Sequence, residues 1–200
     1  MQIGILGFQG AIEEHETVLA SLGVHTLRVK KPDDLSNIDG LVIPGGESTT
    51  MLKMLDFAHL FDPLQTALTE GLPVMATCAG LILLARETTH PAQKTLKQLD
   101  ILVERNGYGS QYFSFCEEVG IESFEKPFRA VFIRAPIILS TGPAVRVMAR
   151  DHLGHPIFVQ SNRQFGITFH PELSGDNRIH SLFLQSILHE SVGGHYVRTF

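Results

Sequence analysis

The residues around Cys78 constrain the fold more than any other part of the sequence. An apolar run, Pro73 to Thr77, predicts a buried strand, and Gly80 to Glu87 follow at once with a helical pattern. Only Cys78 and Ala79 lie between the two elements. Small residues in such a turn allow a nucleophile elbow, in which a side chain projects from the carboxyl end of a strand. The segment therefore favours an α/β fold.

The remainder of the first half repeats this alternation of strand and helix. Gly23 and Gly71 each follow a helical pattern and predict its end. Strands that alternate with helices indicate βαβ units around a parallel sheet. The expected strands are residues 2–8, 25–29, 40–44 and 73–77, and the expected helices are residues 11–22, 51–55, 63–70 and 80–87.

The second half predicts an antiparallel region on the same sheet, because its strand candidates are joined by glycine and proline turns. These candidates are residues 101–104, 130–134, 145–149, 157–160 and 165–169, followed by a helix at 177–190. We expect a single-domain α/β fold with a flavodoxin-like, mostly parallel mixed sheet and helices on both faces. The domain is expected to span residues 1–190, with 191–200 as a flexible tail.

Composition excludes several classes of protein. The chain has 200 residues, 44% apolar and 18% charged, which fits one globular domain. A net charge of −5 argues against nucleic-acid binding, which needs clustered Lys and Arg. The longest apolar stretch, residues 79–85, is far shorter than the ~20 residues of a membrane-spanning helix.

The two cysteines are expected to be free thiols. The chain starts without the basic and apolar regions of a signal peptide, so a cytoplasmic location is expected, where thiols stay reduced. Cys78 precedes a helix, whose N-terminus favours a thiolate and offers backbone N–H groups to an oxyanion. The alternative for Cys78 is a buried structural cysteine. Cys116, in an aromatic stretch without adjacent basic groups, is expected to be a structural thiol.

A histidine and a carboxylate follow the last predicted strand. His170 and Glu172 are separated by one proline, so both side chains can project from the same side of an extended chain. A carboxylate beside an imidazole fixes its tautomer and raises its basicity. Together with Cys78 they would form a Cys–His–acid set for acyl transfer. The alternative is an ordinary surface histidine in a turn.

The segment Pro44 to Thr50 joins a predicted strand to a helix. Its two glycines allow backbone N–H groups to approach a ligand closely, and Ser48 or Thr49 could cap the helix. It is not a Walker phosphate loop, because no lysine follows the glycines. His152 and His155 lack partners at zinc-ligand spacing. Neither a metal nor a cofactor is expected.

Three segments together resemble the signatures of the class I, or triad, glutamine amidotransferases. They are Pro44–Thr49, Thr77–Ile82 and Phe169–Leu173. Their residues are most similar to those of glutaminase subunits of pyridoxal 5′-phosphate synthases. The resemblance runs from about residue 1 to residue 188.

The resemblance implies a role for each matched residue. Cys78 would attack the side-chain amide of glutamine, His170 would act as base and then protonate the leaving ammonia, and Glu172 would orient His170. The backbone N–H groups of Gly46 and Ala79 would hold the oxyanion. The positions matched to glutamine binding are Gly46, Glu47, Ser48, Arg105, Ile133 and Arg134.

The reaction implied is hydrolysis of L-glutamine to L-glutamate and ammonia through a thioester on Cys78. The ammonia would pass to a separate synthase chain that builds pyridoxal 5′-phosphate (vitamin B6), and glutaminase activity would be weak until the two chains dock. Two alternatives stay open at this point. One is a glutaminase subunit of another amidotransferase pathway, and the other is a non-catalytic thiol redox sensor.

The sequence departs from the family pattern at three places. Ala76 stands where the family usually has glycine, and Ser110 and Phe113 replace an arginine and an aspartate. The loss of this arginine and this aspartate is expected to affect local charge pairing and coupling to the partner. The end of the chain, residues 193–200, has no functional interpretation.

Overall fold

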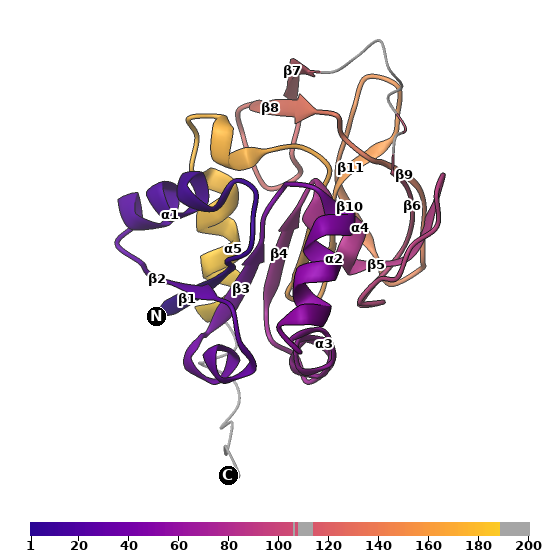
Figure 1. Ribbon diagram of the computed structural model, residues 1–200. Coiled ribbons are helices and arrows are strands. Elements are labelled where there is room, and N and C mark those ends of the chain that lie inside the picture. Colours follow the sequence, from indigo (N-terminus) through magenta and orange to yellow (C-terminus); the bar gives the residue numbers. More distant parts are fainter. Residues whose placement is uncertain (106, 108–113, 189–200) are drawn as a thin grey trace.

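A computed structural model describes residues 1–105, 107 and 114–188. Its centre is a seven-stranded sheet in the order β10-β11-β12-β4-β3-β1-β2 (Figure 1). Strands β2, β1, β3, β4 and β12 run parallel, and β11 and β10 continue the sheet in antiparallel fashion. The bounds are β1 (Gln2–Leu6), β2 (His25–Val29), β3 (Gly40–Ile43), β4 (Val74–Thr77), β10 (Arg146–Arg150), β11 (Pro156–Ser161) and β12 (Gln164–Ile167).

Helices cover both faces of this sheet (Figure 1). One face carries α1 (Ile12–Ser21) and α5 (Arg178–Leu188), and the other carries α2 (Ser48–Phe57), α3 (Phe61–Thr69) and α4 (Ala79–Leu84). The parallel order β2-β1-β3-β4-β12 is the flavodoxin-like order. The predicted fold class is therefore confirmed.

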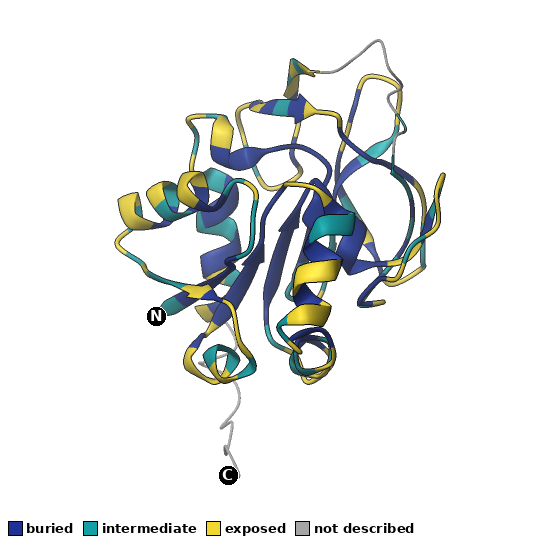
Figure 2. Ribbon diagram, viewed as in Figure 1, coloured by how far each residue is buried: buried dark blue, intermediate teal, exposed yellow. Residues whose placement is uncertain are grey.

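Side chains of the central strands point alternately to the two faces of the sheet, so the core consists of two layers. Leu41 and Ile43 of β3 pack in the cluster that contains α2 and α3, whereas Val42 packs in the cluster that contains α1 and α5. Successive side chains of a strand point to opposite faces, so a strand between two helical layers is apolar throughout. Figure 2 shows β3 and β4 buried along their length, while the outer sides of α1 and α2 are exposed.

The second half is only partly the expected extension of the main sheet. Strands β5 (Ala85–Thr89), β6 (Leu99–Glu104) and β9 (Ile137–Thr141) form a three-stranded sheet, and β7 (Ser114–Val119) pairs with β8 (Phe128–Ile133). The helix expected over residues 80–87 ends at Leu84, because Ala85 begins a strand that pairs with β6. Short 3₁₀ helices, η1 (Pro32–Asn37) and η2 (Pro171–Leu173), complete the elements.

Some of the remaining sequence predictions match the structure closely, and others concern residues that the structure does not describe. The predicted strand at residues 25–29 matches β2, and Gly23 and Gly71 adopt positive φ angles of 73° and 100° after their helices. The proposed tail, residues 191–200, and the substitutions at Ser110 and Phe113 lie outside the described residues. Among the described residues, no helix combines the length and apolar character that crossing a bilayer requires.

Candidate active site

The segments that follow β3, β4 and β12 meet at one edge of the main sheet. These strands are parallel neighbours, so their carboxyl ends lie together. β3 leads into the glycine loop at residues 44–47, β4 leads into Cys78, and β12 leads toward His170. Open α/β sheets bind ligands at this edge.

Cys78 has the backbone geometry of a nucleophile elbow. It lies between β4 and α4 with φ 47° and ψ −105°, and its N–H donates to the Ile167 carbonyl oxygen at 2.8 Å. A Cβ atom at Gly80 would overlap the Ile43 carbonyl oxygen, so only glycine lets α4 approach β3 so closely. The Cys78 N–H bond to Ile167 and the close approach of Gly80 to Ile43 both fix this turn. They hold the Cys78 side chain at the carboxyl end of β4.

His170 is held by its backbone and by its ring. Its N–H donates to the Val131 carbonyl oxygen at 2.8 Å, and its ring lies against Gly45, where a Cβ atom would overlap Cε1. Nδ1 of His170 lies 2.6 Å from Oε1 of Glu172. The expected extended chain is wrong here: Glu172 lies in η2, and this turn folds the carboxylate back to the imidazole.

The protonation of His170 depends on both Glu172 and the Cys78 thiol. Burial lowers the pKa of His170, but hydrogen bonds to Cys78 and Glu172 raise it by more, to about 10. Burial raises the pKa of Glu172, but its contacts with His15 and His170 lower it by more. His170 is therefore an imidazolium at neutral pH, between a thiol group and a carboxylate.

The glycine loop leads into α2 through Glu47. The Glu47 carboxylate accepts hydrogen bonds from Thr49 N at 3.2 Å and Thr50 N at 2.7 Å, so Glu47 caps the helix. Side-chain hydrogen bonding by Thr49 is the main cause that lowers the pKa of Glu47 to about 2. The expected cap by Ser48 or Thr49 is wrong, because Ser48 Oγ instead donates to Gln93 Oε1 at 3.1 Å.

The other predicted substrate-binding residues surround this loop and Cys78. Arg105 places Nη2 at 3.9 Å from Glu47 Oε1, and its buried Nε finds no hydrogen-bond partner within the described part of the chain. Cys78 Sγ lies 3.8 Å from the carbonyl oxygen of Ile133, and Arg134 follows with φ 46°.

The two predicted oxyanion donors lie on the segments that meet at Cys78. Ala79 is the first residue of α4, where a helix leaves its N–H groups without intrahelical partners. Gly46 lies in the glycine loop against the Gln9 amide, and Gln9 Nε2 donates to the Glu47 carbonyl oxygen at 2.8 Å.

Sequence reasoning missed the groups behind Glu172. His15 of α1 and His180 of α5 are fully buried, and Nε2 of His15 lies 3.4 Å from Oε2 of Glu172. A histidine at an apolar-facing helix position was the available signal in both cases, since Leu19 and Leu184, each four residues further along the helix, are buried.

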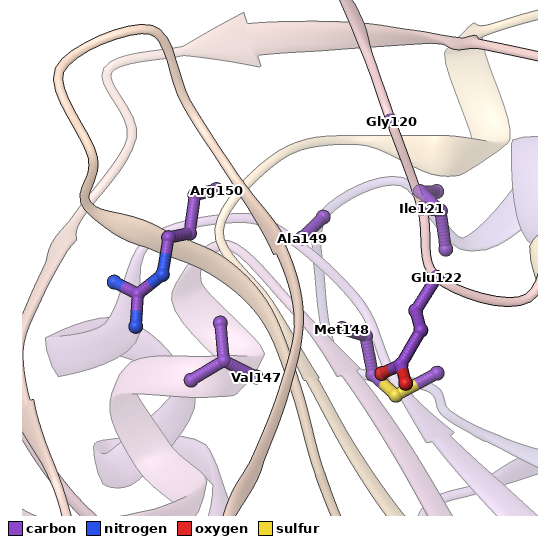
Figure 3. Close-up of a pocket in the computed structure, with 7 residues that line it drawn as sticks. All are labelled: Gly120, Ile121, Glu122, Val147, Met148, Ala149 and Arg150. Atoms are coloured by element: carbon purple, nitrogen blue, oxygen red, sulfur yellow. The ribbon is translucent and has the colours of Figure 1, made fainter.

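Two other features lie apart from these groups. Cys116 is exposed on β7, and Arg129 Nη2 donates to its sulfur at 3.5 Å, so the expectation of a structural thiol without basic neighbours is wrong. Figure 3 shows a surface pocket between residues 120–122 and 147–150, which contains none of the predicted site residues. Its carboxylate, Glu122, is paired with Arg146 at 2.6 Å.

Comparison with known proteins identifies the family. The model of the SNO glutamine amidotransferase family matches residues 5–189. The chain belongs to this family. A relative from Dictyoglomus turgidum, named pyridoxal 5′-phosphate synthase subunit PdxT, is 52% identical over 92% of this chain and 98% of its own. A protein of the same name from Thermosipho africanus is 45% identical over 94% of this chain and 99% of its own.

Solved structures agree with this family membership. A crystal structure described as glutamine amidotransferase superposes with a TM-score of 0.87 at 38% identity, covering 92% of this chain and 98% of that one. A glutamine amidotransferase from Thermotoga maritima has a TM-score of 0.60 at 14% identity, covering 96% of this chain and 98% of that one. At that level of identity the second likeness shows the shared fold alone.

Proposed function

We propose that Cys78, His170 and Glu172 carry out the glutaminase reaction. The protein is a glutaminase of the SNO family, which hydrolyses L-glutamine to L-glutamate and ammonia. The observation that carries the assignment is the position of His170, which is hydrogen-bonded to Glu172 at 2.6 Å and coupled to the Cys78 thiol. A nucleophile, a base and an acid that orients the base are the groups required for acyl transfer.

The reaction proceeds through a covalent intermediate in two steps. The thiolate of Cys78 attacks the amide carbon of glutamine, and the backbone N–H groups of Gly46 and Ala79 stabilise the oxyanion. His170 donates its proton to the leaving nitrogen, so ammonia departs and a γ-glutamyl thioester remains. Water then attacks the thioester, His170 takes a proton from the water, and glutamate leaves with the thiolate restored.

Glutamine is held beside this set by the glycine loop and by Arg105. Because the Glu47 and Ser48 side chains are engaged within the protein, these residues and Gly46 contact the substrate through their backbone groups. The guanidinium of Arg105 suits the substrate α-carboxylate, since its buried Nε has a hydrogen bond to offer. Ile133 and Arg134 line the side of the site next to Cys78.

The ammonia serves the synthesis of pyridoxal 5′-phosphate (vitamin B6), and the partner that receives it is the synthase chain. Relatives that are 45% and 52% identical over nearly the whole chain are named as subunits of that synthase. Residues 1–190 act as the glutaminase domain of a cytoplasmic complex that uses neither a nucleic acid nor a membrane.

The test is a glutamate-release assay with and without the synthase chain. Cys78→Ala is expected to abolish release in both conditions, and Cys116→Ala, the matched change at the exposed thiol, retains it. We expect the wild type to be stimulated by the synthase. Unchanged turnover in Cys78→Ala overturns the catalytic assignment, and equal rates with and without the synthase contradict the coupling.

A further inference from the structure

Two buried histidines connect helices on one face of the sheet. Nδ1 of His15 in α1 lies 2.9 Å from Nε2 of His180 in α5, and both residues are fully inaccessible to solvent. Buried imidazoles need hydrogen-bond partners, because a buried polar group without one destabilises the fold. The pair is therefore a specific polar connection within an otherwise apolar layer.

The connection continues to the proposed catalytic acid. Nε2 of His15 lies 3.4 Å from Oε2 of Glu172 and 3.4 Å from Oγ1 of Thr77, the residue before Cys78. The Glu172 side chain is fully buried, and its other oxygen, Oε1, faces His170. A continuous series of polar groups thus runs from His180 through His15 and Glu172 to His170.

One arrangement of protons fits this series. If His15 carries its proton on Nε2, it donates to Oγ1 of Thr77, places that N–H 3.4 Å from the Glu172 carboxylate, and accepts from Nε2–H of His180 at Nδ1. The opposite tautomers would direct a lone pair of His15 at the carboxylate. They would also leave N–H on Nδ1 of His180, which has no hydrogen-bond partner among the described residues. A buried donor without an acceptor is costly, so the first arrangement is preferred.

The electrostatic environment agrees with neutral rings in this pair. Burial lowers the pKa of His15 more than the nearby carboxylates of Glu172 and Glu14 raise it. Burial and the neighbouring His15 lower the pKa of His180 to about 3. Glu172 is therefore faced by a neutral donor from α1 on one side and by the His170 imidazolium on the other.

We propose that His15, whose tautomer is fixed by His180, is a positioning residue for Glu172. Oε2 of Glu172 is buried and accepts no hydrogen bond among the described residues, and Nε2–H of His15 lies 3.4 Å from it. In this role the electrostatic attraction between that N–H and Oε2 keeps Oε1 directed at Nδ1 of His170. The inference rests on the proposed function, because it concerns the same catalytic acid. His15 touches neither the substrate nor the thiol in this role and acts through Glu172 alone.

A pair of isosteric substitutions separates this role from simple packing. The amide nitrogen of glutamine can replace Nε2 of histidine, whereas that of asparagine replaces Nδ1. In the complex with the synthase, His15→Asn is expected to lower kcat about tenfold, the loss expected for one polar contact, with KM unchanged. His15→Gln is expected to keep most of the activity.

The pH profile supplies a readout that packing alone would not move. Removing a polar group that favours the charged form electrostatically raises the pKa of a carboxyl group. In His15→Asn the acidic limb of the kcat profile is therefore expected at higher pH than in the wild type and in His15→Gln. Leu19→Ala, a buried change one turn further along α1, is the matched control: it lowers stability without moving that limb.

The outcomes distinguish this inference from the proposed function. An inactive wild type contradicts the function, whereas equal kcat values and acidic limbs in His15→Asn and His15→Gln overturn the role of His15 alone. If His15→Asn does not fold, His180→Leu replaces it. That variant removes the donor to His15 and is expected to shift the acidic limb in the same direction, and an unmoved limb overturns the proposal.

Discussion

Nδ1 of His170 lies 2.6 Å from Oε1 of Glu172, although only Pro171 separates the two residues in the chain. The 3₁₀ turn η2 brings them together by folding the acid back toward the ring. Since Nδ1 is engaged by the carboxylate, Nε2 is the atom that exchanges a proton with Cys78 in the proposed mechanism.

Replacing Glu172 by glutamine should remove most of the activity without removing the fold. The amide can occupy the same space, but it does not stabilise the imidazolium or select the tautomer with the proton on Nδ1. We expect kcat for glutamate release to fall on the order of 10³- to 10⁴-fold, as when the acid of a comparable triad is made an amide. A loss of less than about tenfold would show that Glu172 does not support His170.

The stability of the protein should fall at alkaline pH because of His170. Its folded-state pKa of about 10 lies above the ordinary value of 6.5, so its contribution is complete below about pH 6.5 and is lost as pH rises through 10. Urea unfolding of wild type and His170→Gln at several pH values measures this loss. The wild type should lose more free energy of unfolding than the variant between pH 7 and pH 10, and parallel curves would contradict the assignment.

Glu47 should stabilise α2 through its cap. Glu47→Ala is expected to lower the free energy of unfolding by about 1 kcal/mol, the usual value for a lost N-cap, and Glu47→Gln by less. The pKa of Glu47 is lowered to about 2, so the charge-dependent part of this effect is present above about pH 4.5 and is lost as pH falls through 2. Denaturant titrations in this range should show wild type and Glu47→Gln converging at the acidic end.

Gly80→Ala should distort the turn that presents Cys78. The new Cβ atom would overlap the carbonyl oxygen of Ile43, which is backbone and cannot rotate away. We expect a loss of about 1–3 kcal/mol in the free energy of unfolding, typical of overpacking, together with reduced kcat. Gly120→Ala is the control, since nothing lies within 4 Å of a Cβ at that position. Similar effects of the two substitutions would refute this account of the elbow.

The sequence predicted those parts of the fold that depend on local pattern. The apolar runs of β1, β3 and β4 mark strands buried on both faces, and the small residues after Thr77 predict the turn at Cys78. The three segments that resemble the family then indicated which loops belong together. Local pattern and family resemblance were sufficient to predict the fold class and to name the candidate triad.

The parts that were missed depend on contacts between distant segments. Residues 85–89 continue a helical pattern, but pairing with β6 makes them a strand, and no local residue signals that pairing. His15 and His180 are 165 residues apart in the chain, and each alone looks like a core histidine. Arg129 faces Cys116 only because β7 and β8 pair. Tertiary pairing decides such features, which is why sequence pattern does not reveal them.

The place of β12 in the sheet has a consequence for synthesis of the chain. β12 pairs with β4 through residues 164–167, and the segment after β12 contains the proposed base and acid, whereas Cys78 follows β4. A nascent chain in which the first 150 residues have emerged therefore has the thiol but neither His170 nor Glu172. In the proposed mechanism, hydrolysis of glutamine must await nearly complete translation, so a product truncated before His170 would keep the thiol and release no ammonia.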